Sequence, residues 1–94
     1  MEFNKIGIEV IDVKTDNKIC SGMARTELGE KYELTGRTPA GKGICRSAMT
    51  AIDSMGLFMM LTDKTELEKN DYFDVTCPHG VCTFRLTRDG KYTV

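Results

Sequence analysis

The sequence predicts an α+β fold, with a small antiparallel sheet of four to five strands packed against one main helix. Apolar and polar residues alternate over residues 6–10 and again over 72–77 and 82–87, where a turn motif separates the last two segments. Between these strand patterns, apolar residues recur every three or four positions from Cys45 to Met59, which is the period of a helix packed by one face.

The N-terminal third predicts short strands joined by polar turns. Ile6–Val13 is the first strand, and Ile11 and Val13 break its alternation as a bulge or a second buried face would. Residues 14–18 include Asp and Asn, which tolerate the conformations of tight turns, so a short return strand is expected to begin at Ile19. Lys31–Thr35 predicts a further short strand.

The helix is predicted to begin near Cys45, after the loop Gly36–Gly43. Its apolar stripe comprises Cys45, Ala48, Ile52, Met55 and Met59. Gly56 interrupts this stripe at a cost of about 1 kcal/mol relative to alanine. The helix therefore either ends near Ser54, with Gly56 as its C-terminal cap, or continues with a kink to Leu61.

The last third predicts a hairpin around Pro78–Val81. Either a two-residue turn at His79-Gly80 or a four-residue loop produces the same register. That register places Cys77 opposite Cys82, Val75 opposite Phe84, and Phe73 opposite Leu86, with all six on the face that packs on the helix. Arg88–Lys91 contains Asp-Gly and repeats the hairpin signal, so a second turn and a short last strand at 92–94 are expected.

Length and charge exclude several classes of protein. The 94 residues suffice for a single domain, 1–94, with one core. Thirteen basic and 14 acidic residues leave a net charge of −1, which excludes a general nucleic-acid or membrane-surface binder. No apolar stretch approaches the roughly 20 residues of a bilayer span. The N-terminus lacks a signal-peptide pattern, so a cytoplasmic protein without a membrane partner is expected.

Four cysteines are the most unusual feature of the composition. The cytosol keeps thiols reduced, so we expect thiols rather than a disulfide framework, with inert core thiols, metal ligation and redox chemistry as the alternatives. Cys77, His79 and Cys82 form a Cys-x-His-x-x-Cys pattern that supplies three ligands suited to zinc or iron. Cys45 or Cys20 is the candidate fourth ligand, although the alternation points both hairpin thiols into the core. No cofactor is the default expectation.

Cys45 is the candidate reactive thiol. A thiolate at a helix N-terminus is stabilised by unpaired backbone N–H groups and by the helix dipole, and Lys42 and Arg46 add positive charge beside it. The same region is a candidate anion site. Arg37, Lys42 and Arg46 give a local charge of +3, because no acidic residue lies between Gly36 and Thr50.

Methionines recur along the predicted helix, at positions 49, 55, 59 and 60. At helical spacing such residues usually belong to the core, and they also form adaptable binding surfaces. If part of the run is exposed, a homodimer through the Met-rich helix follows.

Several motifs together resemble a known family. The segment Arg37–Gly41 stands ahead of Gly43-x-Cys45 at a helix start, and Cys77-Pro78-x-Gly80 and Phe84–Leu86 follow. This arrangement, over residues 36 to 88 plus an N-terminal strand, resembles a family of small uncharacterised prokaryotic proteins. Members carry Asp where this chain has His79, and Cys20 and Cys82 match no motif of the family. The resemblance implies a cytoplasmic, anaerobe-associated protein and brings no established activity.

The sequence therefore predicts a small accessory or binding module rather than an enzyme. Its site is expected where the helix start, with Lys42, Cys45 and Arg46, meets the final hairpin, with Cys77 and His79. The ligand is a small anion or a protein partner. A thiol- or metal-dependent redox component, with Cys45 as the reactive thiol and Cys77 as its partner, is the alternative, and a structural homodimer is the second.

Overall fold

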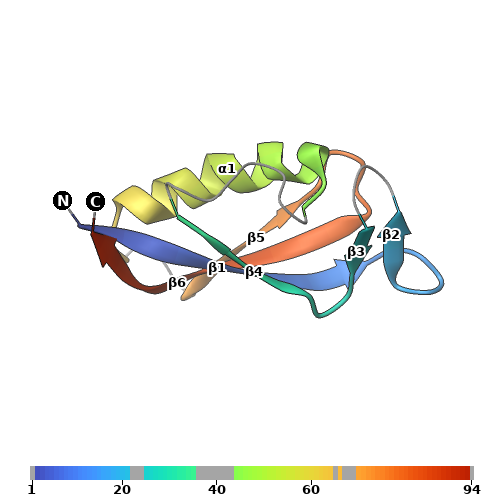
Figure 1. The fold of residues 1–94 in the computed structure, drawn as a ribbon, viewed down its shortest axis with the longest axis horizontal. Helices are drawn as coiled ribbons and strands as arrows, with labels where there is room; N and C mark the ends of the chain where they lie inside the picture. Colours follow the sequence, from blue (N-terminus) through green and yellow to red (C-terminus); the bar gives the residue numbers. More distant parts are fainter. Residues whose placement is uncertain (1, 22–24, 36–43, 65, 67–69, 94) are drawn as a thin grey trace.

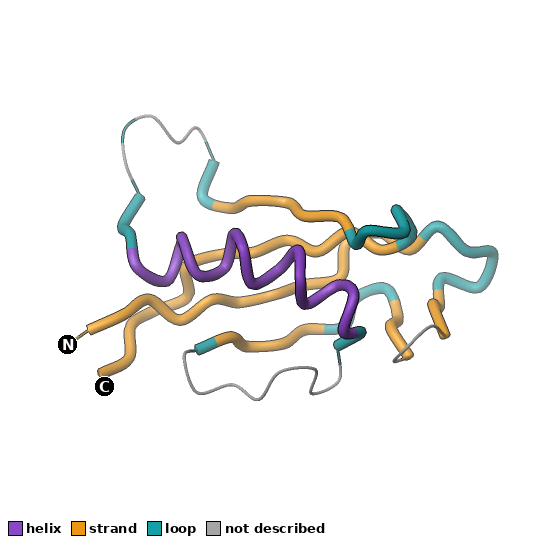
Figure 2. The backbone as a smooth tube through the Cα atoms, turned by 90° about the horizontal axis from the view of Figure 1, so that it is seen from above, coloured by secondary structure: helices purple, strands orange, loops and turns teal. Residues whose placement is uncertain are grey.

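The architecture is a four-stranded antiparallel sheet with one helix across one face, as the sequence predicts (Figure 1). The computed structural model describes residues 2–21, 25–35, 44–64, 66 and 70–93. Two twelve-residue strands, β1 (Glu2–Val13) and β6 (Cys82–Thr93), pair along the middle of the sheet. The edge strands are β4 (Lys31–Leu34) beside β1 and β5 (Tyr72–Thr76) beside β6. The helix α1 (Arg46–Leu61) lies lengthwise over the sheet, as the view from above shows (Figure 2).

A second, two-stranded sheet lies at one end of the molecule, formed by β2 (Ile19–Ser21) and β3 (Arg25–Glu27) (Figure 1). The predicted return strand thus pairs with β3, which the sequence did not predict, and not with β1. The reason is that both sides of β1 are occupied. Strand β6 pairs along one side, and β4 and the turn before it pair along the other, where Val10 exchanges backbone hydrogen bonds with Gly29 and Glu30 at 2.9 Å.

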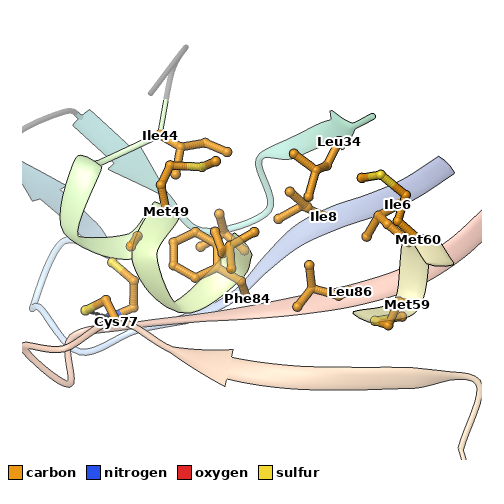
Figure 3. Close-up of a cluster of buried hydrophobic side chains, with 14 of the residues drawn as sticks. Ile6, Ile8, Leu34, Ile44, Met49, Met59, Met60, Cys77, Phe84 and Leu86 are labelled. Atoms are coloured by element: carbon orange, nitrogen blue, oxygen red, sulfur yellow. Dashed lines mark hydrogen bonds between the residues drawn. The ribbon is translucent and has the colours of Figure 1, made fainter. Parts of the chain in front are cut away.

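The core lies between α1 and the sheet and follows the two periodicities read from the sequence. Alternate residues of β1 and β6 point toward the helix, and one apolar stripe of the helix packs against them. The members that are at most 2 % exposed are Ile6, Ile8, Val10, Val13, Ala48, Ile52, Met59, Phe84 and Leu86. Burying one of the larger of these side chains stabilises the fold by about 1.5–3 kcal/mol. Figure 3 shows this cluster, with Met59 and Met60 at one end and Cys77 at the other.

The C-terminal hairpin has the predicted register. Phe73 pairs with Leu86 and Val75 with Phe84, and the four-residue version of the loop is the one observed. The prediction of a second hairpin at 88–91 is wrong. Strand β6 continues through Asp89-Gly90 as a bulge, where Gly90 has φ +86° and the pairing with β1 shifts between Asn4 and Ile6. Because β1 still offers pairing partners at that point, the chain does not need to turn.

Helix α1 runs through Gly56 to Leu61, so the longer of the two predicted helices is observed. Gly56 is buried in the helix, and a Cβ atom there would lie 2.7 Å from Cδ2 of Leu34. The missing side chain therefore allows the helix to cross β4 closely. This contact explains a glycine in a helix interior better than the predicted cap does.

The methionines of α1 belong to the core. Met49, Met59 and Met60 are buried, and the hydroxyl of Tyr92 donates to Sδ of Met60 at 3.0 Å. These three side chains pack on the sheet, and a homodimer through the Met-rich helix stays a prediction. The exposed apolar side chains of α1 are instead Leu57, Phe58 and Leu61. Within the described part of the chain, no helix has both the length and the apolar character needed to cross a bilayer.

Candidate functional site: a thiol-lined cavity

A cavity of about 310 Å³ lies where the start of α1, the hairpin loop and the β2–β3 pair meet. Its walls are mostly apolar. All four cysteines of the chain and its single histidine line it. The lining residues are Cys20, Thr26, Cys45, Ser47, Ala48, Cys77, His79, Val81, Cys82 and Phe84. We refer to this feature as the thiol-lined cavity.

Each cysteine reaches the thiol-lined cavity from a different structural context. Cys77 and Cys82 flank the hairpin loop one step beyond the last paired residues of β5 and β6, and Cys77 N–H donates to the carbonyl of Cys82 at 2.9 Å. Cys45 directly precedes the first residue of α1. Cys20 pairs with Thr26 in the small sheet. The predicted meeting of helix start and hairpin is thus observed, and Cys20 joins it.

Cys77 occupies a position that favours its thiolate. Burial by itself raises the pKa of this thiol, but backbone N–H groups of the hairpin loop outweigh burial and lower the pKa below its ordinary value. These donors belong to Cys82, Val81, His79 and Gly80. The N–H of Cys82 lies 3.4 Å from Sγ of Cys77. The turn of this loop is closed by Gly80 N–H, which donates to the Cys77 carbonyl at 2.8 Å.

The surroundings of Cys82 have the opposite effect on the pKa of its thiol. Burial, together with repulsion from the neighbouring sulfurs of Cys20, Cys77 and Cys45, raises the pKa of its thiol to about 12. The thiols of Cys82 and Cys20 also share a hydrogen bond. The cavity therefore presents one thiol whose pKa is lowered beside one whose pKa is raised.

All four cysteines lie in the described part of the chain, and none of them forms a disulfide. Cys77 and Cys82 are buried, whereas Cys20 and Cys45 are partly exposed. The expectation of reduced thiols stays a prediction. Backbone groups that stabilise a thiolate are found at Cys77, and Cys45 as the reactive thiol also stays a prediction.

The predicted metal site finds no support in the arrangement of side chains. The structure places Cys45, Cys77, His79 and Cys82 around one cavity, with Cys20 beside them. Over residues 2–21, 25–35, 44–64, 66 and 70–93, however, no group of three or more His, Cys, Asp or Glu side chains is positioned to hold a metal ion. Sulfurs that line the same cavity are therefore not, by that fact alone, positioned as zinc or iron ligands.

The predicted anion site lies largely outside the described residues, because Arg37 and Lys42 both fall within 36–43. Arg46 is described and is the first residue of α1, where it is exposed. The N-cap residue, Cys45, makes no side-chain capping hydrogen bond. Anion binding at this end of α1 stays a prediction.

Sequence reasoning offered Cys20 only as an alternative fourth metal ligand and did not place it beside the hairpin. The segment Ile19–Ser21 carries a weak strand pattern, and its contact with the hairpin arises only because β2 and β3 fold together against the end of the main sheet. The alternation that located Cys77 and Cys82 is a local signal, whereas this contact is not. Thr26, only 2 % exposed in a short polar segment, shares the cavity wall with Cys20.

Comparison of the chain with protein-family models, with curated proteins and with solved structures finds no match. The resemblance to a family of small prokaryotic proteins stays a prediction. Function is therefore argued from the geometry of the thiol-lined cavity.

Proposed function

We propose that this chain is a small binding module that holds a small, mostly apolar ligand in the thiol-lined cavity. The observation that carries the proposal is the convergence of all four cysteines and the histidine, from three separate segments of the chain, on one cavity. If buried thiols were placed in a core by chance, they would not be expected to line the same cavity.

The character of the cavity supports a ligand of limited size and polarity. Its volume of about 310 Å³ lies at the lower end of the range of about 300–1,000 Å³ found for small-molecule sites. Apolar walls with few polar groups are typical of such sites. Unfilled apolar space also costs stability, which favours a role for a cavity that the fold retains. Reduced thiols around it are consistent with the proposed cytoplasmic location.

Two of the residues that line the cavity are accessible to solvent and give a ligand a route into it. His79 is exposed at the hairpin loop and lines the cavity, and Cys45 is partly exposed at the helix start. Ala48, by contrast, is 1 % exposed and has the smallest side chain in the wall. A larger residue at position 48 therefore fills space that the ligand would occupy.

Benzene tests the proposal as a neutral apolar probe in ¹H–¹⁵N correlation spectra of the protein. We expect saturable shifts concentrated at Ala48, Val81, Cys82 and Phe84. The variant Ala48→Leu should weaken them at least about tenfold, by occupying the space the probe needs. Thr83→Ala is the control, because Thr83 bonds Thr76 on the other face of the hairpin at 3.3 Å. Shifts that do not saturate, or that survive Ala48→Leu unchanged, would contradict the proposal.

A further inference from the structure

We propose that the ligand of the thiol-lined cavity is a small, uncharged disulfide, and that Cys77 and Cys82 exchange thiols with it and end joined in an intramolecular disulfide. This inference rests on the proposed function and names the substrate class of the same site. It departs from the sequence-based alternative, which paired Cys45 with Cys77, because the geometry gives Cys77 the role of nucleophile and Cys82 the role of resolving thiol.

The first argument is the position of Cys77. A thiolate, and not a thiol, attacks a disulfide sulfur. The Sγ atom of Cys77 lies 3.4 Å from the N–H of Cys82, at the mouth of a loop whose other N–H groups also stabilise negative charge on it. The same sulfur lines the cavity, so a ligand there meets the nucleophile directly.

The second argument is the reach of Cys82. The pair Thr76–Thr83 is the last registered pair of the hairpin, and Cys77 and Cys82 follow it with an N–H···O bond of 2.9 Å between them. Cα atoms of directly opposed residues lie about 4.5–5.5 Å apart, which is within the range that a disulfide spans. Closing the bond therefore needs side-chain rotation and no rearrangement of the strands.

The third argument concerns the order of events. Burial and the neighbouring Cys20 are the larger causes of the raised pKa of Cys82, and the charge on Cys77 adds to them. When Cys77 enters a mixed disulfide, that charge is removed, and its contribution to the raised pKa of Cys82 is lost. The resolving thiol thus becomes easier to ionise only after the first exchange has occurred.

The chemistry balances as follows. The Cys77 thiolate attacks one sulfur of R–S–S–R, forming a Cys77–S–S–R bond, and RS⁻ leaves with the electron pair of the broken S–S bond and takes up a proton. Cys82 then loses its proton, and its sulfur attacks Sγ of Cys77 and displaces a second RS⁻, which is also protonated. The protein dithiol is oxidised to a disulfide, and one R–S–S–R is reduced to two RSH.

The test uses 2-hydroxyethyl disulfide, a neutral disulfide small enough for the cavity, with the whole chain under anaerobic conditions at a pH of about 6.5. Intact mass and peptide mapping follow the products with time. We expect a transient adduct on Cys77 and then a Cys77–Cys82 disulfide, formed about tenfold faster than in the urea-unfolded chain, because only the folded chain stabilises the thiolate.

Variants separate the two roles. Cys82→Ala should stop the reaction at the Cys77 adduct, Cys77→Ala should slow adduct formation to the rate of the unfolded chain, and Thr83→Ala should behave as wild type. A Cys77–Cys20 disulfide in Cys82→Ala, or equal rates in the folded and unfolded chains, would overturn the inference. Benzene binding without exchange would overturn this inference alone, whereas loss of both would overturn the proposed function as well.

Discussion

Cys77 and Cys82 face each other across one hairpin, yet their surroundings drive ionisation in opposite directions. The loop directs backbone N–H groups at Cys77 and so lowers the pKa of its thiol against the effect of burial. Cys82 receives no such compensation, and burial together with three neighbouring sulfurs raises the pKa of its thiol to about 12. Two thiols five positions apart in sequence therefore have different chemistry, because a single loop donates to only one of them.

The raised pKa of Cys82 predicts a loss of stability in alkaline solution. The folded chain retains a proton that the unfolded chain releases near pH ~8.5, so this contribution is complete below that pH and is lost as pH rises toward about 12. Urea unfolding of wild type and Cys82→Ala between pH of about 8 and 11 measures it. The free energy of unfolding should fall more steeply with pH in wild type, and parallel curves would contradict the assignment.

The elements show how much of the fold local patterns determine. Period-two alternation is enough to place Phe73 opposite Leu86 and Val75 opposite Phe84, because a hairpin pairs residues close in sequence. Asp89-Gly90 carries the same turn signal as a true hairpin, but β1 continues alongside it, and pairing with β1 converts the turn into a bulge. Gly56 is similar, since its purpose depends on Leu34 of another element. Such features depend on tertiary partners that a local pattern does not contain.

The candidate site also combines residues that local sequence patterns locate with residues that they do not. Hairpin register and helical periodicity were enough to predict that the start of α1 lies near Cys77, His79 and Cys82. Cys20 was not predicted to lie there, because β2 reaches the cavity only through its pairing with β3. The N–H groups around Cys77 were not predicted, because they depend on the shape of the loop, and Cys45 as the reactive thiol stays a prediction.

The end of α1 is fixed by two side chains of the sheet. Asn4 of β1 is 5 % exposed, and its Nδ2 donates to the carbonyls of Met59 and Thr62 at 3.0 and 2.7 Å. Arg88 of β6 donates from Nε to the same two carbonyls at 3.2 and 2.8 Å. The carbonyls at a helix C-terminus lack partners within the helix, so strands β1 and β6 together supply them.

Replacing Asn4 should therefore destabilise the whole fold. Asn4→Ala removes donors from buried carbonyls, and we expect the free energy of unfolding to fall by about 1–3 kcal/mol, measured by urea denaturation. Asn70→Ala is the matched control, because Asn70 is exposed, and it should change stability by less than about 0.5 kcal/mol. An Asn4→Ala variant as stable as the control would show that these hydrogen bonds do not anchor the helix.

At the scale of the whole molecule, the anchored C-terminus of α1 and the thiol-lined cavity lie at opposite ends. The two central strands pair from Glu2–Thr93 at one end to Val13–Cys82 at the other, in a body of 41 × 29 × 19 Å (Figure 1). Asn4 and Arg88 anchor the helix C-terminus near the first end. The helix start, the hairpin loop and the small sheet enclose the thiol-lined cavity at the second. The long sheet therefore separates the thiol-lined cavity from the anchored C-terminal end of α1.

The central claim is that this cavity presents Cys77 as a stabilised thiolate. Iodoacetamide alkylation of the folded chain over a range of pH, with each cysteine followed by peptide mapping, tests it most directly. We predict that Cys77 is modified first, and that its rate rises at a lower pH than in the urea-unfolded chain, because the loop N–H groups lower its pKa. Faster modification of Cys45 or Cys20, or a Cys77 rate profile identical in the folded and unfolded chains, would contradict the claim.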